Sequence, residues 1–167
     1  FNTVEDYENY LKRMDGFTAW VDTAIANMRT GMKQGVVLPR RIAERTIERL
    51  QEVAPGKPEK SLFYGCIENM PDHVDKATKQ RLEQAYSAAI RDKLAPAYKQ
   101  LIRFMETDYL PNCRESLAWT QLPDGQNWYA YRIRAYTTTN LSPEDIFKLG
   151  QREVGRIVGQ IQEISDS

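Results

Sequence analysis

The stretch Thr3–Met32, TVEDYENYLKRMDGFTAWVDTAIANMRTGM, decides the fold class of this 167-residue chain. Its apolar side chains recur at steps of three and four, which is the spacing of one face of an α-helix. These residues are Tyr7, Tyr10, Met14, Phe17, Val21, Ile25, Met28 and Met32. Thr3 and Asp6 are spaced as a capping pair. The pattern therefore predicts a first helix of about 28 residues with one continuous buried seam.

The middle of the chain repeats this helical pattern and is interrupted by proline and glycine. Pro39 suits the first turn of a second helix. The buried side of that helix is predicted to hold Ile42, Ala43, Ile47, Leu50 and Val53. Residues 54–60 predict a loop, and residues 61–70 an irregular segment. A third helical region is expected from near Val74 to Met105. Pro96 should kink or divide it, because proline lacks an N–H and crowds the preceding turn.

Two more helices are predicted after a turn at Pro123–Gly125, where proline presets one backbone angle and glycine tolerates a positive one. The first spans Trp128–Tyr136 and ends at Thr137–Thr139, because β-branched hydroxyl residues compete with helical hydrogen bonds. The second begins at Ser142, a good capping residue that proline and two acidic residues follow. Its apolar residues are Ile146, Leu149, Val154, Ile157, Ile161 and Ile164.

These elements predict an all-α fold. No alternating run supports a strand, and no period of roughly 20 to 50 residues repeats. The expected architecture is an antiparallel bundle of long helices with short Pro/Gly turns and a kink or break near Pro96. The length and the 41% hydrophobic content favour a single helical domain over residues 1–167.

The charge balance limits the classes of partner. The chain has 23 basic and 23 acidic side chains, which argues against nucleic acid or an anionic membrane as its main partner. The arginines after Pro39 alternate with Glu44, Glu48 and Glu52 at helical spacing, so a solvated face is expected there. No apolar run approaches the roughly 20 residues of a transmembrane segment.

The two cysteines leave two alternatives. A disulfide between Cys66 and Cys113 would close a loop of about 48 residues and stabilise the fold by about 4 kcal/mol. Alternatively, both are buried free thiols that pack as small apolar side chains. Because there are only two cysteines and no C-x-x-C spacing, free thiols are favoured.

No catalytic residue and no metal ligand is predicted in this chain. A zinc site needs at least three ligands, and the only histidine is His73. Its position near Asp72 and Asp75 is typical of a surface histidine close to a helix start. A single histidine also gives no support for a serine or cysteine nucleophile paired with a histidine base.

The candidate substrate-binding residues are Tyr129, Arg132 and Tyr136, which share one helix face at spacings of three and four. There, a guanidinium could grip a peptide carboxylate while the phenols supply hydrogen bonds. Alternatively, these side chains cover apolar surface or pair with local carboxylates. The other side of this helix, with Trp128, Tyr131 and Ala135, is assigned to packing.

Several stretches carry a resemblance to a known family. They are Tyr7–Leu11, Gly31–Pro39, Leu122–Gly125, Trp128–Tyr129, Ile133–Arg134, Tyr136–Thr139, Leu141–Ile146, Gly150 and Arg152–Ile157. In them the chain resembles the DUF885 family, bacterial proteins that include many described as lipoproteins and that look like HExxH zinc metallopeptidases. Where many members have a histidine, this chain has Phe147, so any role of that histidine is not carried over. Phe147 is assigned to packing.

The resemblance implies that this chain is an amino-proximal fragment that lacks the HExxH part. It would form a helical wall of a substrate cleft and would not be catalytic alone, with no cofactor in the fragment and zinc in the full-length protein. Its expected partners are the rest of its own polypeptide, a peptide substrate and a second copy in a homo-oligomer. The implied location is the periplasm or cell envelope, although the residues themselves leave the cytoplasm open. The alternative function is a non-enzymatic helical protein-interaction or scaffold module.

A metal analysis tests the shortage of ligands. We expect the purified chain, incubated with zinc and freed of contaminants, to bind no stoichiometric zinc and to cleave no peptide, because one histidine and dispersed carboxylates do not make a zinc site. Elemental analysis measures the bound metal. One tightly held zinc per chain that is lost in His73→Ala would contradict this prediction.

Overall fold

The computed structural model describes residues 1–166 and confirms the all-α fold: over these residues every named element is a helix or a helical turn. The internal contacts divide the chain into two compact units, Phe1–Leu117 and Ala118–Ser167, which we describe separately. The single domain over residues 1–167 stays a prediction. Within residues 1–166, no helix is both long and apolar enough to cross a membrane.

Helix α1 spans Val4–Lys33 and confirms the first predicted helix. Thr3 and Asp6 form a capping box, in which the Thr3 side chain accepts from the Asp6 N–H and the Asp6 side chain accepts from the Thr3 N–H. The side chains of Tyr7, Met14 and Val21 are almost fully buried and recur every seven residues. The predicted seam is therefore the buried face of α1.

The remaining elements of the first unit are one medium helix, a set of short turns and one long helical run. Helix α2 spans Arg40–Val53 and confirms the second predicted helix, except that Ile42, predicted to be buried, is 42% exposed. The short turns are η1 (Pro58–Lys60), η2 (Leu62–Tyr64) and the four-residue α3 (Gly65–Glu68), in the stretch expected to be a loop and an irregular segment. The long run comprises α4 (Lys76–Ala89), η3 (Ile90–Leu94), α5 (Ala95–Phe104), η4 (Met105–Tyr109) and η5 (Leu110–Asn112).

Two wide π-helical turns, η3 and η4, each stand just before a proline in this long run. Their bonds span five residues, from the Ala95 N–H to the Ile90 carbonyl and from the Leu110 N–H to the Met105 carbonyl. Pro96 and Pro111 each follow such a turn by two residues, so the carbonyl that each ring would crowd lies in the middle of the turn. The boundary predicted near Pro96 is confirmed, and it takes the form of a π turn. The helical run also continues past the predicted end at Met105, because the second π turn, η4, joins α5 to η5.

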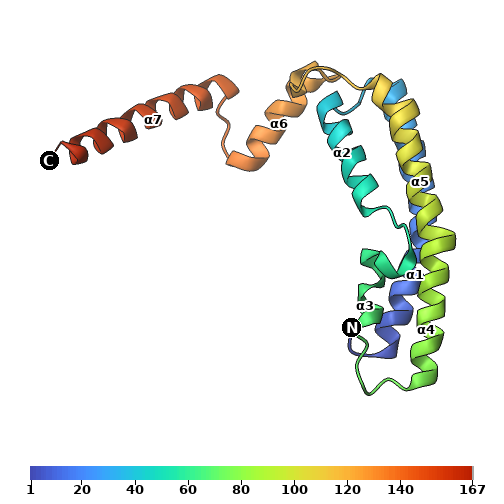
Figure 1. Ribbon diagram of the computed structural model, residues 1–167. Helices are drawn as coiled ribbons and strands as arrows, with labels where there is room; N and C mark the ends of the chain where they lie inside the picture. The colour runs from blue at the N-terminus through green and yellow to red at the C-terminus, as the bar shows by residue number, and fades with distance from the viewer. Residues whose placement is uncertain (167) are drawn as a thin grey trace. The chain divides into compact units, whose positions relative to one another are not determined.

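Polar contacts between α1 and the long run fix their relative direction. Lys93 Nζ lies 2.5 Å from Asp15 Oδ1, and Gln100 Nε2 lies 2.9 Å from Asp22 Oδ1; both pairs are 78 residues apart. The Arg29–Asp108 pair is 79 residues apart. A constant separation means that α1 and α4–α5 run parallel, side by side (Figure 1).

The expected antiparallel arrangement therefore needs one correction. Helix α2 runs opposite to both long elements, whereas α1 and α4–α5 share one direction (Figure 1). The reason is that α2, α3 and the turns between them carry the chain back along α1 before α4 begins. The bundle is all-helical, with α2 alone as an antiparallel medium helix in the first unit.

The core of the first unit consists of two apolar clusters along this parallel pair. One joins α1, α2 and α5 and contains Val21, Ile25, Ala43, Ile47, Ala97, Leu101, Phe104, Met105, Tyr109 and Cys113. The other joins α1, α3 and α4 and contains Tyr7, Met14, Ile67, Leu82, Tyr86, Ala89, Ile90 and Leu94. Cys113 belongs to the first cluster, and Cys66 packs against the second.

Both thiols are free, so the disulfide alternative is wrong; Cys113 is buried as expected, whereas Cys66 is only partly buried. Burial raises the pKa of both Cys66 and Cys113, which keeps them protonated and apolar. Burial also raises the pKa of Tyr86, whose hydroxyl donates to the Tyr7 carbonyl at 2.9 Å. That neutral hydrogen bond ties α4 to the first turns of α1.

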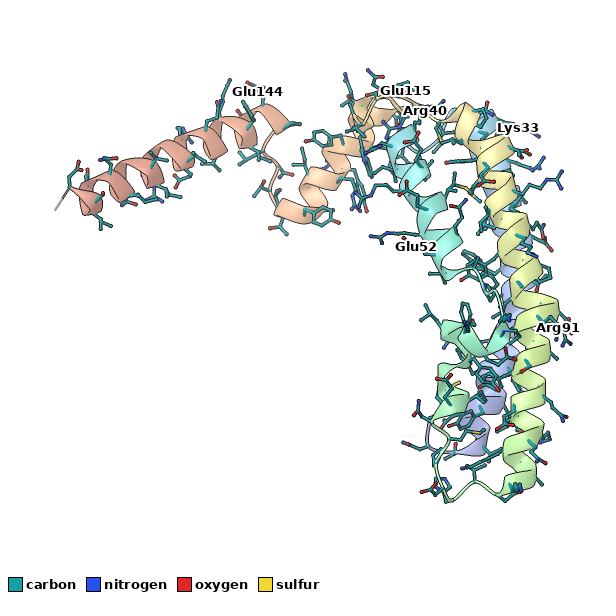
Figure 2. The ribbon with its side chains drawn as sticks, in the orientation of Figure 1. Lys33, Arg40, Glu52, Arg91, Glu115 and Glu144 are labelled. Atoms are coloured by element: carbon teal, nitrogen blue, oxygen red, sulfur yellow. The ribbon has the colours of Figure 1, made fainter. Side chains whose placement is uncertain are left out.

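The start of α2 is held against the exit of the long run. The Arg40 N–H donates to the Arg114 carbonyl at 2.8 Å, and the Leu38 N–H donates to the Tyr109 hydroxyl at 3.0 Å. The Arg40 guanidinium pairs with Glu115 at 2.6 Å, and Figure 2 shows these two side chains next to each other. The solvated face predicted for α2 is confirmed, because Arg41, Glu48 and Glu52 are exposed.

The second unit contains η6 (Trp119–Gln121), α6 (Gly125–Thr137) and α7 (Pro143–Ser165). Both predicted helices are confirmed. Ser142 and Asp145 form a capping box at the start of α7, and Thr138 ends α6 in a left-handed conformation with φ 56°. In the turn before α6 the positive φ of 55° falls on Asp124, whereas the sequence interpretation gave it to glycine. Aspartate tolerates this region better than most residues do.

A cavity mutation tests the second cluster. Leu82 is fully buried, so Leu82→Ala should lower the free energy of unfolding of the first unit by about 2 to 5 kcal/mol. Urea denaturation followed by circular dichroism measures this change. Leu62→Ala is the matched control because Leu62 is 78% exposed, and its effect should stay within about 0.5 kcal/mol. Equal effects of the two variants would contradict the assigned core.

Candidate functional site

An open and mainly apolar cavity of about 450 Å³ lies in the second unit between η6, α6 and the first turn of α7, and we call it the aromatic cavity. Aromatic and aliphatic side chains line most of it, together with one guanidinium. The lining residues are Trp119, Tyr129, Arg132, Ile133, Tyr136, Thr137, Pro143, Ile146 and Phe147. All of them belong to the second unit.

Gly125 sets one wall of the aromatic cavity by letting η6 approach the start of α6. A Cβ atom at this position would lie 2.1 Å from the Trp119 carbonyl oxygen, a distance that real atoms do not reach. Gly125 is buried, and its N–H donates to the Leu122 carbonyl at 2.8 Å. Glycine is therefore required here by close backbone contact, and the contact brings Trp119 beside α6.

Arg132 lies at the centre of the cavity wall and is held by two aromatic side chains. One guanidinium nitrogen donates to the Tyr136 hydroxyl at 2.6 Å, and the guanidinium carbon lies 4.5 Å from the centre of the Tyr136 ring. The same carbon lies 5.8 Å from the Trp119 ring centre. No ion pair to Arg132 is found among residues 1–166. Arg132 therefore covers aromatic surface and does not neutralise a local carboxylate.

The structure brings the three candidate residues together, because Tyr129, Arg132 and Tyr136 all line the aromatic cavity. Tyr136 is the most open of them at 75% exposure. Their shared face was predictable from helical spacing alone. Their role in binding a substrate stays a prediction.

Trp119 was not identified from the sequence, and four packing assignments need correction, because these residues are exposed: Trp128, Tyr131, Ala135 and Phe147. Trp119 was missed because its position depends on the close contact at Gly125, which no periodic pattern signals. Phe147 was assigned to packing but is 62% exposed and lines the cavity. Trp128 and Tyr131, also assigned to packing, are both exposed by more than half. Among the described residues, the second unit has no apolar core that could cover them.

His73 lies far along the chain from this cavity, just before α4. Its Nε2 atom lies 3.0 Å from the Asn2 carbonyl oxygen, and the residue is exposed, which confirms the surface-histidine interpretation. The predicted helix start shifts by a few residues, because Asp75 provides the cap and accepts from the Thr78 N–H at 3.0 Å. Within residues 1–166, no three His, Cys, Asp or Glu side chains lie close enough to hold a metal ion.

Comparisons with known proteins identify a family and a similar solved structure. The family model described as "Bacterial protein of unknown function (DUF885)" matches residues 1–167. A similar solved structure is "The crystal structure of the putative lipoprotein from Colwellia psychrerythraea", with a TM-score of 0.88 and 24% sequence identity. The match covers 98% of this chain and 28% of that chain, so this chain spans less than a third of the other's length. No curated protein matches it.

Replacing Gly125 tests how the aromatic cavity is built. Gly125→Ala should push η6 away from α6, shift the Trp119 indole N–H resonance and abolish nuclear Overhauser contacts between Trp119 and Arg132. Gly159→Ala is the control, because a Cβ there meets open space; it should only stabilise helix α7, by up to about 1 kcal/mol. An unchanged Trp119 resonance in Gly125→Ala would contradict the assigned contact.

Proposed function

We propose that this chain, which belongs to the DUF885 family, forms one helical wall of a substrate cleft in a longer, metallopeptidase-like protein. In this proposal the chain binds substrate and does not catalyse alone. The observation that carries it is the aromatic cavity, where Trp119, Tyr129 and Tyr136 stand with the Arg132 guanidinium in one open hollow.

The chemistry of this hollow fits a peptide with a free carboxylate. Guanidinium groups bind carboxylates through parallel charged hydrogen bonds. Arg132 commits one nitrogen to Tyr136 and has further N–H donors, since a guanidinium carries five. The contacts with Tyr136 and Trp119 also restrict the side chain before any ligand arrives, which lowers the entropic cost of binding.

The apolar part of the wall would hold the side chain next to that carboxylate. Ile133, Ile146 and Phe147 contribute aliphatic and aromatic surface beside Arg132. A cavity of about 450 Å³ is within the usual size range of small-ligand sites. The proposed ligand is therefore a peptide whose carboxylate lies next to an apolar or aromatic residue.

The location and the metal are part of the proposal. A cell-envelope or periplasmic location is supported by the similar structure, which is described as that of a lipoprotein. Zinc would belong to a part of the longer protein that carries an HExxH motif. The donor set of residues 1–166 does not fit zinc, so we assign no catalytic step to this chain.

The second candidate function is a non-enzymatic helical interaction or scaffold module. Its support is the amount of apolar surface on the second unit, where Trp128, Val154 and Ile161 are each more than half exposed. The coding sequence after Ser167 separates the two candidates. An HExxH motif downstream supports the cleft wall, and its absence favours the module.

Substitution of Arg132 tests the cleft wall in the longer protein. Arg132→Ala should raise KM for peptides with a free carboxylate and lower kcat/KM by about 10- to 100-fold, which corresponds to the loss of a charged hydrogen bond of about 1.5 to 3 kcal/mol. Steady-state assays on matched peptides, with the terminal carboxylate free or amidated, measure this loss. Amidation of the peptide should change kcat/KM of the variant little, because the guanidinium that binds the carboxylate has already been removed.

Arg134→Ala is the matched control for this test. Arg134 lies on the same helix but does not line the aromatic cavity. Its replacement should leave kcat/KM for both peptides near the wild-type value. The cleft-wall proposal fails if Arg132→Ala and Arg134→Ala have the same kinetics at equal stability.

A further inference from the structure

Helix α7 carries a continuous apolar seam that no other element of the second unit covers along its length. Its positions are separated by steps of three and four residues: Phe147, Gly150, Val154, Ile157 and Ile161. Every apolar side chain of this α7 seam is at least 46% exposed, and Val154 is 62% exposed. Soluble proteins rarely leave such a row of branched side chains open to water.

The spacing of the α7 seam specifies the kind of partner. A mean step of about 3.5 residues keeps a stripe facing one neighbouring helix along its length, as in left-handed helix pairs. The seam therefore fits an amphipathic helix with an apolar stripe of its own.

Several charged side chains of α7 pair with neighbours on the same helix. Arg156 pairs with Glu153 at 2.9 Å and donates to Gln160 at 2.9 Å, and Lys148 pairs with Glu144 at 3.4 Å. The α7 seam itself carries no charge. Contact along it would accordingly be apolar.

A second copy of α7 is a poor occupant. Its first turn carries Glu144 and Asp145, and its end carries Glu163 and Asp166. An antiparallel self-pair would place acidic ends beside each other at both ends of the contact. A parallel self-pair would place the two acidic first turns side by side, with both helix dipoles pointing in the same direction, which is also unfavourable.

We propose that the α7 seam packs along a helix from the rest of a longer polypeptide of this family. The similar lipoprotein structure supports this occupant: it matches 98% of this chain, yet the match accounts for only 28% of that chain. Most of such a protein lies outside the matched region and is available to cover α7. The inference uses the same longer polypeptide as the proposed function, but it involves neither substrate nor catalysis.

Hydrogen exchange followed by mass spectrometry tests this packing in the protein extended by its natural continuation. The α7 amides should exchange on the order of 100-fold more slowly there than in the chain of residues 1–167. Ile161→Lys should accelerate α7 exchange in the longer protein about tenfold or more, because it removes one buried side chain and inserts a charge. The neighbouring Gln162→Lys adds the same charge off the seam and should leave exchange unchanged.

Three results would overturn the proposal. The first is equal α7 exchange in the short and long chains. The second is equal acceleration by Ile161→Lys and Gln162→Lys. The third is α7 protection in the short chain that rises with protein concentration, which would identify a second copy as the occupant. The exchange rate of the amides around Leu82 shows whether the first unit stays folded in each variant. If Ile161→Lys accelerates exchange in that core as well, Ile161→Ala is used in its place. Because no substrate is used, failure of this test leaves the cleft-wall proposal standing.

Discussion

The parallel alignment of α1 with the long run of α4 and α5 is the constraint on which the first unit depends. Asp15, Asp22 and Arg29 lie one heptad apart on α1, and each contacts a polar partner on the long run. These contacts are at the surface and individually add little stability. They show the register between α1 and the long run, which the buried side chains of Tyr7, Met14 and Val21 determine. Helices α2 and α3 pack over the two ends of this parallel pair.

The helices could be predicted from the sequence because their signals are local. The seam of α1 and the capping residues Thr3 and Ser142 each act within a few residues of their own position. The relative direction of α1 and α4–α5 could not be predicted, since helical periodicity carries no information about direction. The π turns before Pro96 and Pro111 were only partly predictable: proline signals a disturbance, but the surrounding core decides whether the helix breaks or widens.

The residues of the candidate site also fall into a group that was predictable from the sequence and a group that was not. Tyr129, Arg132 and Tyr136 follow from spacing on one helix, so their convergence on one cavity was predictable. Trp119 and Phe147 come from flanking elements and needed the close contact at Gly125 and the turn before α7. Apolar residues such as Trp128 were assigned to packing because composition alone does not distinguish a buried core residue from an exposed apolar residue. Membership of the DUF885 family does not assign an activity to this chain, because the family is described as one of unknown function.

The parallel alignment also affects synthesis on the ribosome. The apolar face of α1 meets partners 78 to 79 residues later in the chain, so its main neighbours do not exist when α1 leaves the exit tunnel. At about 5 to 20 residues per second, the delay is on the order of ten seconds. During that time, a nascent helix with a row of aromatic and aliphatic side chains is a natural client for chaperones that shield apolar segments. The first unit must therefore fold late, only after the long run has been made.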